Sequence, residues 1–139
     1  MTTEQAKELV KQFETCSLPR EKWTHEAHFI MALWYCSHQP LPLAMQSIRD
    51  GIKKYNINVG GANNDHSGYH ETITVFYTRL IINYLLTNDT IRQFENILTG
   101  LFQQPFLAKD FPLKYYSKGL LMSTKARRDW IPPDIQSLS

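Results

Sequence analysis

Apolar residues recur three and four positions apart along most of this chain, which is the spacing of one face of an α-helix. No stretch alternates apolar and polar residues over the length of a strand. The chain of 139 residues suits one domain with a single core. The pattern therefore predicts an all-α, single-domain bundle over residues 1–139 with about five helices. Four of them are expected at about 4–16, 42–57, 68–87 and 90–102. The remaining helix, second in the chain, should start after Trp23 with Thr24 as its N-cap and stop at the segment 39–42, Q-P-L-P.

The most apolar segment runs from Trp23 to Cys36. Its residues 29–35 follow one another without a charge, so this helix has almost no polar face. A helix that is apolar all round is normally buried. The segment 68–87 is the second strongly apolar helix. We expect these two helices to be central in the bundle.

Residues at the predicted helix ends match known capping preferences. Thr3, Thr24, Ser67 and Asp89 each precede a helical segment and suit the N-cap position. Pro42 suits the first turn of the third helix, because its missing N–H is not needed there.

The breaks and the tail complete the predicted architecture. Gly51 inside the third helix indicates a close contact between helices. Residues 58–67 contain paired glycines and asparagines, which are typical of an ordered turn or a mobile loop. In the tail, residues 112–134, we expect short helical pieces at most. It carries two tyrosines and a tryptophan, so we expect it to pack across the bundle.

Composition excludes several classes of protein. The net charge of +2 is too small to indicate nucleic-acid binding. The longest apolar run is too short to cross a membrane, and the first residues do not resemble a signal peptide. Cys16 and Cys36 do not form a disulfide framework, and Cys36 is expected to be a buried free thiol. A cytoplasmic location is the simplest interpretation.

Candidate chemistry lies at the start of the two apolar helices. His25 and His28 are three apart on one helix, and His70 and Glu71 open the other. Side chains at i and i+3 share one helix face. If the loop 58–67 brings the two helix starts together, the three imidazoles converge. Such a set suits zinc, iron, nickel or copper, with Glu71 as general base for a metal-bound water.

Other side chains are candidates for ligand contacts. Tyr69 and Tyr116 can line a pocket, although aromatic residues more often belong to a core. Lys125, Arg127 and Arg128 form a small basic cluster that suits an anionic group, or simply a solvated helix face. The histidines themselves have a plainer interpretation, as caps and packing residues of buried helices.

Three blocks of sequence resemble one family. They are W-T-H-E-A-H from Trp23, G-Y-H-E-T-I-T from Gly68, and Y-Y-S with A-R and W-I-P-P-D between Tyr115 and Asp134. Together they resemble a group of small, uncharacterised bacterial helical proteins. The resemblance implies a single helical domain and no particular reaction. It implies a site containing His25, His28, His70, Glu71, Tyr116 and Arg127.

Three functions follow from these observations. The first is a small-molecule metal-dependent enzyme, hydrolase- or hydratase-like, with the three histidines as ligands. The second is a non-catalytic protein that binds a small polar ligand through the same groups, with Tyr69 and Tyr116 over it. The third is an interaction protein whose histidines merely cap buried helices. The sequence leaves the substrate and the oligomeric state open.

Overall fold

The computed structural model describes residues 1–88 and 93–138, and in these ranges it contains helices and no strand. The prediction of an all-α bundle with about five substantial helices is confirmed. The helices are α1 (Thr3–Glu14), α2 (His25–His38), α3 (Leu41–Asn58), α4 (Glu71–Thr87), α5 (Phe94–Leu101), α6 (Lys118–Leu121) and α7 (Thr124–Arg128). Short 3₁₀ turns are η1 (Arg20–Lys22), η2 (Pro105–Leu107) and η3 (Phe111–Lys114).

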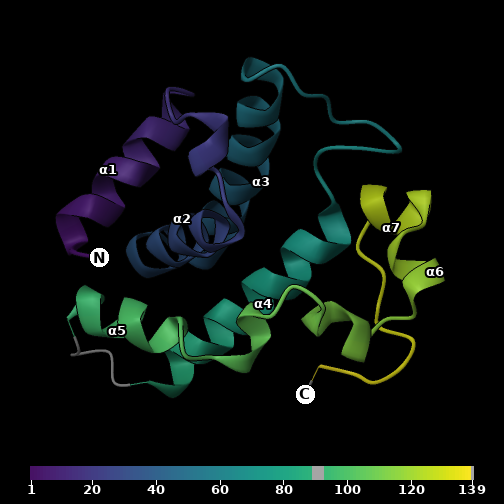
Figure 1. Ribbon diagram of the computed structural model, residues 1–139. Helices are drawn as coiled ribbons and strands as arrows, with labels where there is room; N and C mark the ends of the chain where they lie inside the picture. Colours follow the sequence, from purple (N-terminus) through teal and green to yellow (C-terminus); the bar gives the residue numbers. More distant parts are fainter. Residues whose placement is uncertain (89–92, 139) are drawn as a thin grey trace.

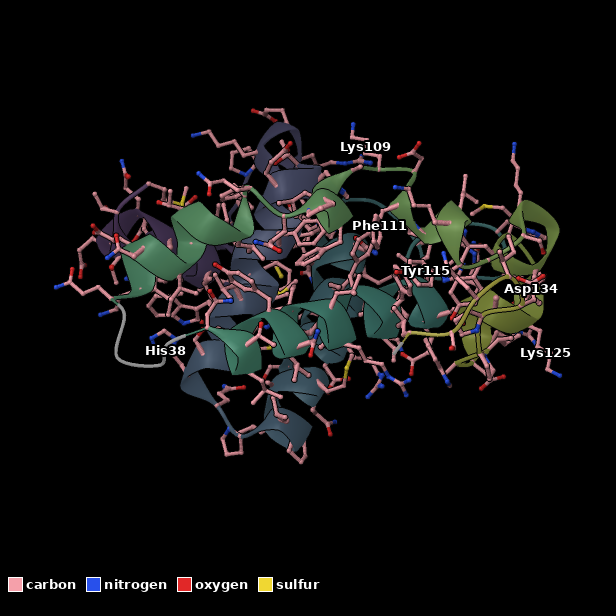
Figure 2. All side chains as sticks on the ribbon, turned by 90° about the horizontal axis from the view of Figure 1, so that it is seen from below. His38, Lys109, Phe111, Tyr115, Lys125 and Asp134 are labelled. Carbon is pink, nitrogen blue, oxygen red and sulfur yellow. The ribbon has the colours of Figure 1, made fainter. Side chains whose placement is uncertain are left out.

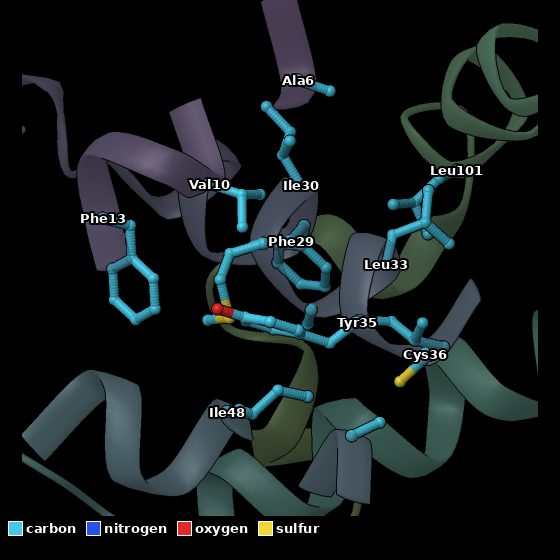
Figure 3. Packing of buried hydrophobic residues seen from close by; sticks show 14 of the residues in the cluster. Ala6, Val10, Phe13, Phe29, Ile30, Leu33, Tyr35, Cys36, Ile48 and Leu101 are labelled. Carbon is cyan, nitrogen blue, oxygen red and sulfur yellow. The ribbon is translucent and has the colours of Figure 1, made fainter. Parts of the chain in front are cut away.

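Helix α2 lies at the centre of the bundle, as its apolar sequence predicts. Figure 1 shows it nearly end-on between α1, α3 and α4. Eight of its 14 residues are buried. In Figure 3, side chains of α2 such as Phe29 and Leu33 lie among Val10 of α1, Ile48 of α3 and Leu101 of α5. The neighbours of α2 thus cover it on several sides.

The first helix starts follow local capping rules. Thr24 caps α2 by accepting a hydrogen bond from Ala27 N–H, as expected. Thr2, and not Thr3, caps α1, because Thr2 and Gln5 form a reciprocal capping box. Pro42 lies in the first turn of α3, as predicted.

The start of α4 differs from the prediction. The helix begins at Glu71, three residues later than expected, and its N-cap is His70 instead of Ser67. The reason is Gly68, whose φ of +82° is left-handed and cannot belong to a right-handed helix. The predicted cap Asp89 and the predicted helix start at 90 lie outside the described residues.

The segment between α3 and α4 forms a turn that asparagine side chains hold by hydrogen bonds. The side-chain oxygen of Asn64 accepts hydrogen bonds from the N–H groups of His66 and Ser67, both at 2.9 Å. The side-chain oxygen of Asn63 accepts from Tyr69 N–H at 3.0 Å. These bonds fix the path by which the chain enters α4.

The tail packs on the first turns of α4, which confirms the expectation. Thr72 Oγ1 donates to the carbonyl of Asp129 at 2.7 Å and accepts from Ile131 N–H at 3.1 Å. The tail elements α6 and α7 lie beside the start of α4, away from α1 (Figure 1). Tyr116 is fully buried in a second apolar cluster with Phe76.

Two further expectations concern the membrane and the cysteines. In the described part of the chain, no helix combines the length and the apolarity that a membrane crossing requires. Both cysteines are free thiols, and Cys36 is buried as expected. Burial raises the pKa of the Cys36 thiol to about 11, so it is protonated at neutral pH.

A pair of glycine variants tests the close contact at Gly51. A Cβ there would lie 2.7 Å from Cε2 of Phe13, a buried ring stacked on Trp23. Overpacking costs about 1–3 kcal/mol and alanine recovers about 1 kcal/mol of helix propensity. Gly51→Ala should therefore lower the free energy of unfolding by up to about 2 kcal/mol in urea titrations.

Gly119→Ala is the matched control, because Gly119 lies in α6 and its added Cβ would meet nothing within 4 Å. This variant should be as stable as the parent or slightly more stable. Equal stabilisation by both alanines would show that Phe13 moves aside at no cost.

Candidate functional site

His25 and His28 lie at a cavity between α2, α3 and α4. The cavity has a volume of about 260 Å³. Polar lining comes from these two histidines and from Thr74, Tyr77 and Thr78 of α4. The remaining walls are apolar: Phe29, Met31, Ala32, Ile48, Ile52, Ile73 and Ile81.

His28 presents a hydrogen-bond acceptor there. Its ring stacks on Trp23 with centroids 3.8 Å apart, and Nδ1 lies 2.7 Å from the carbonyl oxygen of Thr24. A carbonyl only accepts, so Nδ1 carries the proton and Nε2 of the neutral ring has a free lone pair. Burial lowers the pKa of His28, the nearby His25 adds to this, and the Thr24 carbonyl opposes it. The ring is therefore neutral at pH 7.

Nε2 of His28 is not fully buried. Within residues 1–88 and 93–138, no hydrogen-bond partner of this atom is present. The described residues also contain no fully buried side-chain nitrogen or oxygen without a partner. His28 is one of the few polar residues that line this mostly apolar cavity, so its unpartnered nitrogen is a candidate contact for a ligand there.

His25 is fixed at the rim by other elements. Its Nε2 donates to the carbonyl of Leu107 at 2.7 Å. Its ring lies edge-on to Phe29 and Tyr77, with centroids 4.9 and 6.0 Å apart. Tyr77 in turn donates to the carbonyl of Ala108 at 3.3 Å. The chain around η2 thus holds two polar side chains of the cavity.

His70 has a separate, structural place. It is only 8% exposed. Its Nδ1 accepts from Ile73 N–H at 3.1 Å, and Nε2 donates to the carbonyl of Leu121 at 2.7 Å. Burial lowers the pKa of His70 and the charge of Arg127 adds to this, while the bond to Leu121 opposes it. Both ring nitrogens are occupied, so this residue joins α4 to α6.

The predicted convergence of three imidazoles is a point where the structure differs. His25 meets Tyr77, which is seven residues, or about 10.5 Å along a helix, beyond His70. The residue of α4 that contacts the His25 ring is therefore in the second turn of that helix, and the His70 ring is bound instead to Ile73 and Leu121. No group of three or more His, Cys, Asp and Glu side chains in the described ranges is arranged to hold a metal ion.

Three of the other predicted residues do come together, in a second hollow. Tyr69, Glu71 and Arg127 line a polar cleft of about 370 Å³. Two residues that the sequence analysis had not singled out, Arg49 and Lys53, also line it. Their spacing of four along α3 was the available signal, since it places both on one helix face.

Glu71 is an ion-pair partner in this cleft. Nε and Nη2 of Arg49 donate to its two carboxylate oxygens at 2.9 and 2.8 Å, and the Tyr69 hydroxyl donates to Oε1. Burial alone would raise the pKa of Glu71, but the hydrogen bonds from Arg49 and Tyr69 lower it overall. A lowered pKa makes a carboxylate a weaker base. This arrangement does not favour the predicted general-base role.

Tyr116 lies outside both hollows. Its hydroxyl donates to the carbonyl of Ile131 at 2.6 Å, and burial raises its pKa to about 12. Tyr116 thus holds the tail, and its predicted ligand contact stays a prediction.

Compared with known proteins, the chain matches no family model, no curated protein and no solved structure. The two hollows and their chemistry are therefore the features that bear on function.

Substitutions of His70 test its role as a cap. His70→Ala removes a cap, worth about 1 kcal/mol, and a buried hydrogen bond, worth about 1 kcal/mol. We expect a loss of about 2 kcal/mol in chemical unfolding. His70→Asn should lose about half of that, because asparagine caps helices well. Equal losses for both variants would contradict the capping role.

The lowered pKa of His70 also predicts a pH dependence. An unfolded histidine titrates near pH ~6.5, whereas the folded ring titrates lower, so acid protonates the unfolded chain first. The contribution of the neutral His70 ring to the free energy of unfolding is therefore fully present above pH ~6.5. It is lost as the pH falls towards the pKa of the folded protein. The free energy of unfolding measured at pH 7.5 and 5.5 should fall more for the parent than for His70→Asn. An equal fall in both would exclude this contribution.

Proposed function

We propose that this protein binds a small, neutral and mainly apolar molecule with one O–H or N–H donor. The ligand occupies the cavity between α2, α3 and α4. The observation that supports this most directly is the unpartnered Nε2 of the neutral His28 ring, which lines the mostly apolar cavity. A ligand donor would give this nitrogen its hydrogen bond while the rest of the ligand buries apolar surface.

The size of the cavity supports a ligand of one or two rings. Apolar cavities of about 150 Å³ hold benzene. At about 260 Å³ this cavity is larger, which suits a fused bicyclic molecule or a substituted single ring. Larger cofactors need more volume than this.

The polarity of the lining supports a donor on the ligand and not an acceptor or an anion. The Thr74 hydroxyl already donates to the carbonyl of His70 at 2.7 Å, so its oxygen is left to accept. His25 donates through Nε2, which leaves Nδ1 to accept. Among the residues that the structure describes, no lysine or arginine lines the cavity. An anionic group would therefore meet only lone pairs.

The metal-dependent enzyme stays a prediction from sequence. It would require His70 to release its bonds to Ile73 and Leu121 before it joined His25 and His28. Metal analysis of protein purified without a histidine tag tests it directly. One tightly held metal ion per chain, lost on His70→Ala, would favour the enzyme over the binding function.

Indole and indene provide a matched test of the binding function. The two molecules have nearly the same shape, but only indole has an N–H donor. Indole should bind about fivefold to tenfold more tightly in calorimetric titration, which is what one neutral hydrogen bond is worth. His28→Phe keeps the ring on Trp23 but removes Nε2, so it should lower indole affinity to the level of indene.

His38→Phe is the control variant. His38 also stacks on a tryptophan, Trp34, at 3.9 Å and also bonds a carbonyl through Nδ1. His38, labelled in Figure 2, is the last residue of α2, whereas His28 is in its first turn. His38 is not among the residues that line the cavity. Indole affinity should be unchanged in this variant. Binding of indole and indene with equal affinity, or equal effects of both Phe variants, would reject the proposal.

A further inference from the structure

The second hollow points to a binding site that is independent of the cavity. We propose that the polar cleft between α3, the turn before α4, and α7 binds a small dianionic group, such as a phosphate or a phosphate monoester. The cleft has a volume of about 370 Å³. None of its lining residues lines the cavity, so this inference does not rest on the proposed function.

The cleft has an excess of positive charge. Of the residues in the described ranges, four cationic side chains and two carboxylates line it. Both carboxylates are already neutralised by two-pronged pairs with arginine. Arg49 holds Glu71, and Nε and Nη2 of Arg128 donate to the two oxygens of Asp65 at 2.7 Å each. A metal cation would therefore have to displace an arginine from either carboxylate.

Lys53 and Arg127 carry the uncompensated charges. In the ranges that the structure describes, neither forms an ion pair. The Lys53 ammonium lies 5.0 Å from the centre of the Tyr69 ring. Arg127 uses only Nη1, which donates to the carbonyls of Gly68 and Tyr69 at 3.0 and 3.4 Å. Its Nε and Nη2 keep their hydrogens for a ligand.

These donors match the chemistry of a phosphate dianion. A guanidinium with free N–H groups binds two phosphate oxygens at once, and an ammonium adds a point charge. Two excess positive charges balance a doubly charged group. The bond from Arg127 to the backbone of the turn fixes its position before a ligand arrives, which lowers the entropic cost of binding. The volume suits a phosphate and a small attached group.

The experiment is a titration of the whole chain with inorganic phosphate at pH 7.5, at constant ionic strength set with sodium chloride. We expect saturable binding of one phosphate per chain. Calorimetry and the NMR signal of the Arg127 Nε–H would both measure this binding. Methyl phosphate, a dianion, should bind like phosphate. Dimethyl phosphate, a monoanion, should bind at least fivefold more weakly. Equal affinity for both esters would overturn the dianion assignment.

Matched lysine variants separate a site from the general field of the protein. Lys53→Gln and Lys54→Gln remove the same charge from neighbouring residues, but only Lys53 lines the cleft. Lys125→Gln is the equivalent control for α7 (Figure 2). Lys53→Gln should weaken phosphate binding about tenfold, and each control less than twofold. Equal weakening by all three, more than one phosphate per chain, or no difference between phosphate and chloride would overturn the proposal.

Arg127→Lys tests the fork geometry, because it keeps the charge and loses the paired N–H groups. Phosphate affinity should fall about tenfold. Lys53 is exposed and contacts only a ring face, so Lys53→Gln remains informative if the Arg127 variant loosens the tail. Unchanged affinity in both variants would exclude the cleft.

Discussion

The burial of α2 is the constraint on which the rest of the structure depends. A helix without a polar face needs neighbours on every side, and α1, α3 and α4 supply them. Its first turn brings two histidine rings to these neighbours. There His25 and His28 each satisfy one nitrogen with a backbone carbonyl and lie against aromatic rings. At this end of α2 the core opens into the cavity that these two rings line together with residues of α3 and α4.

The sequence predicts most of the fold because local patterns suffice for it. Helical spacing identified the substantial helices, and Thr24 identified the start of α2. The start of α4 was misplaced because Ser67 has better capping chemistry than histidine. The backbone conformation prevents a helix from starting at Ser67. Because Gly68 is left-handed and Tyr69 N–H bonds to Asn63, the helix starts at Glu71 with His70 as its cap. Histidine then serves as a cap because its ring is also held by Leu121.

The candidate site was only partly predictable. The spacing of His25 and His28 predicts that they lie together, because both are on one helix and three residues apart. The position of His70 relative to these two histidines depends on how α4 packs against α2. No local sequence pattern specifies that packing. Tyr69, Glu71 and Arg127 do gather in one cleft. Arg49 was overlooked because an amphipathic pattern assigns every charged residue of a helix to solvent. It cannot show that a carboxylate from another element will meet that charge.

The bonds between the start of α4 and the tail have a consequence for the order of events during synthesis. The hydrogen-bond partner of His70, the carbonyl of Leu121, is synthesised 51 residues later. The partner of Thr72, the carbonyl of Asp129, is synthesised 57 residues later. At about 5–20 residues per second, these partners emerge roughly 3–12 s after α4 begins. During that interval α1, α2 and α3 have all been synthesised and can pack against one another. The growing chain therefore completes its centre first and secures the polar end of α4 last, when the tail leaves the ribosome.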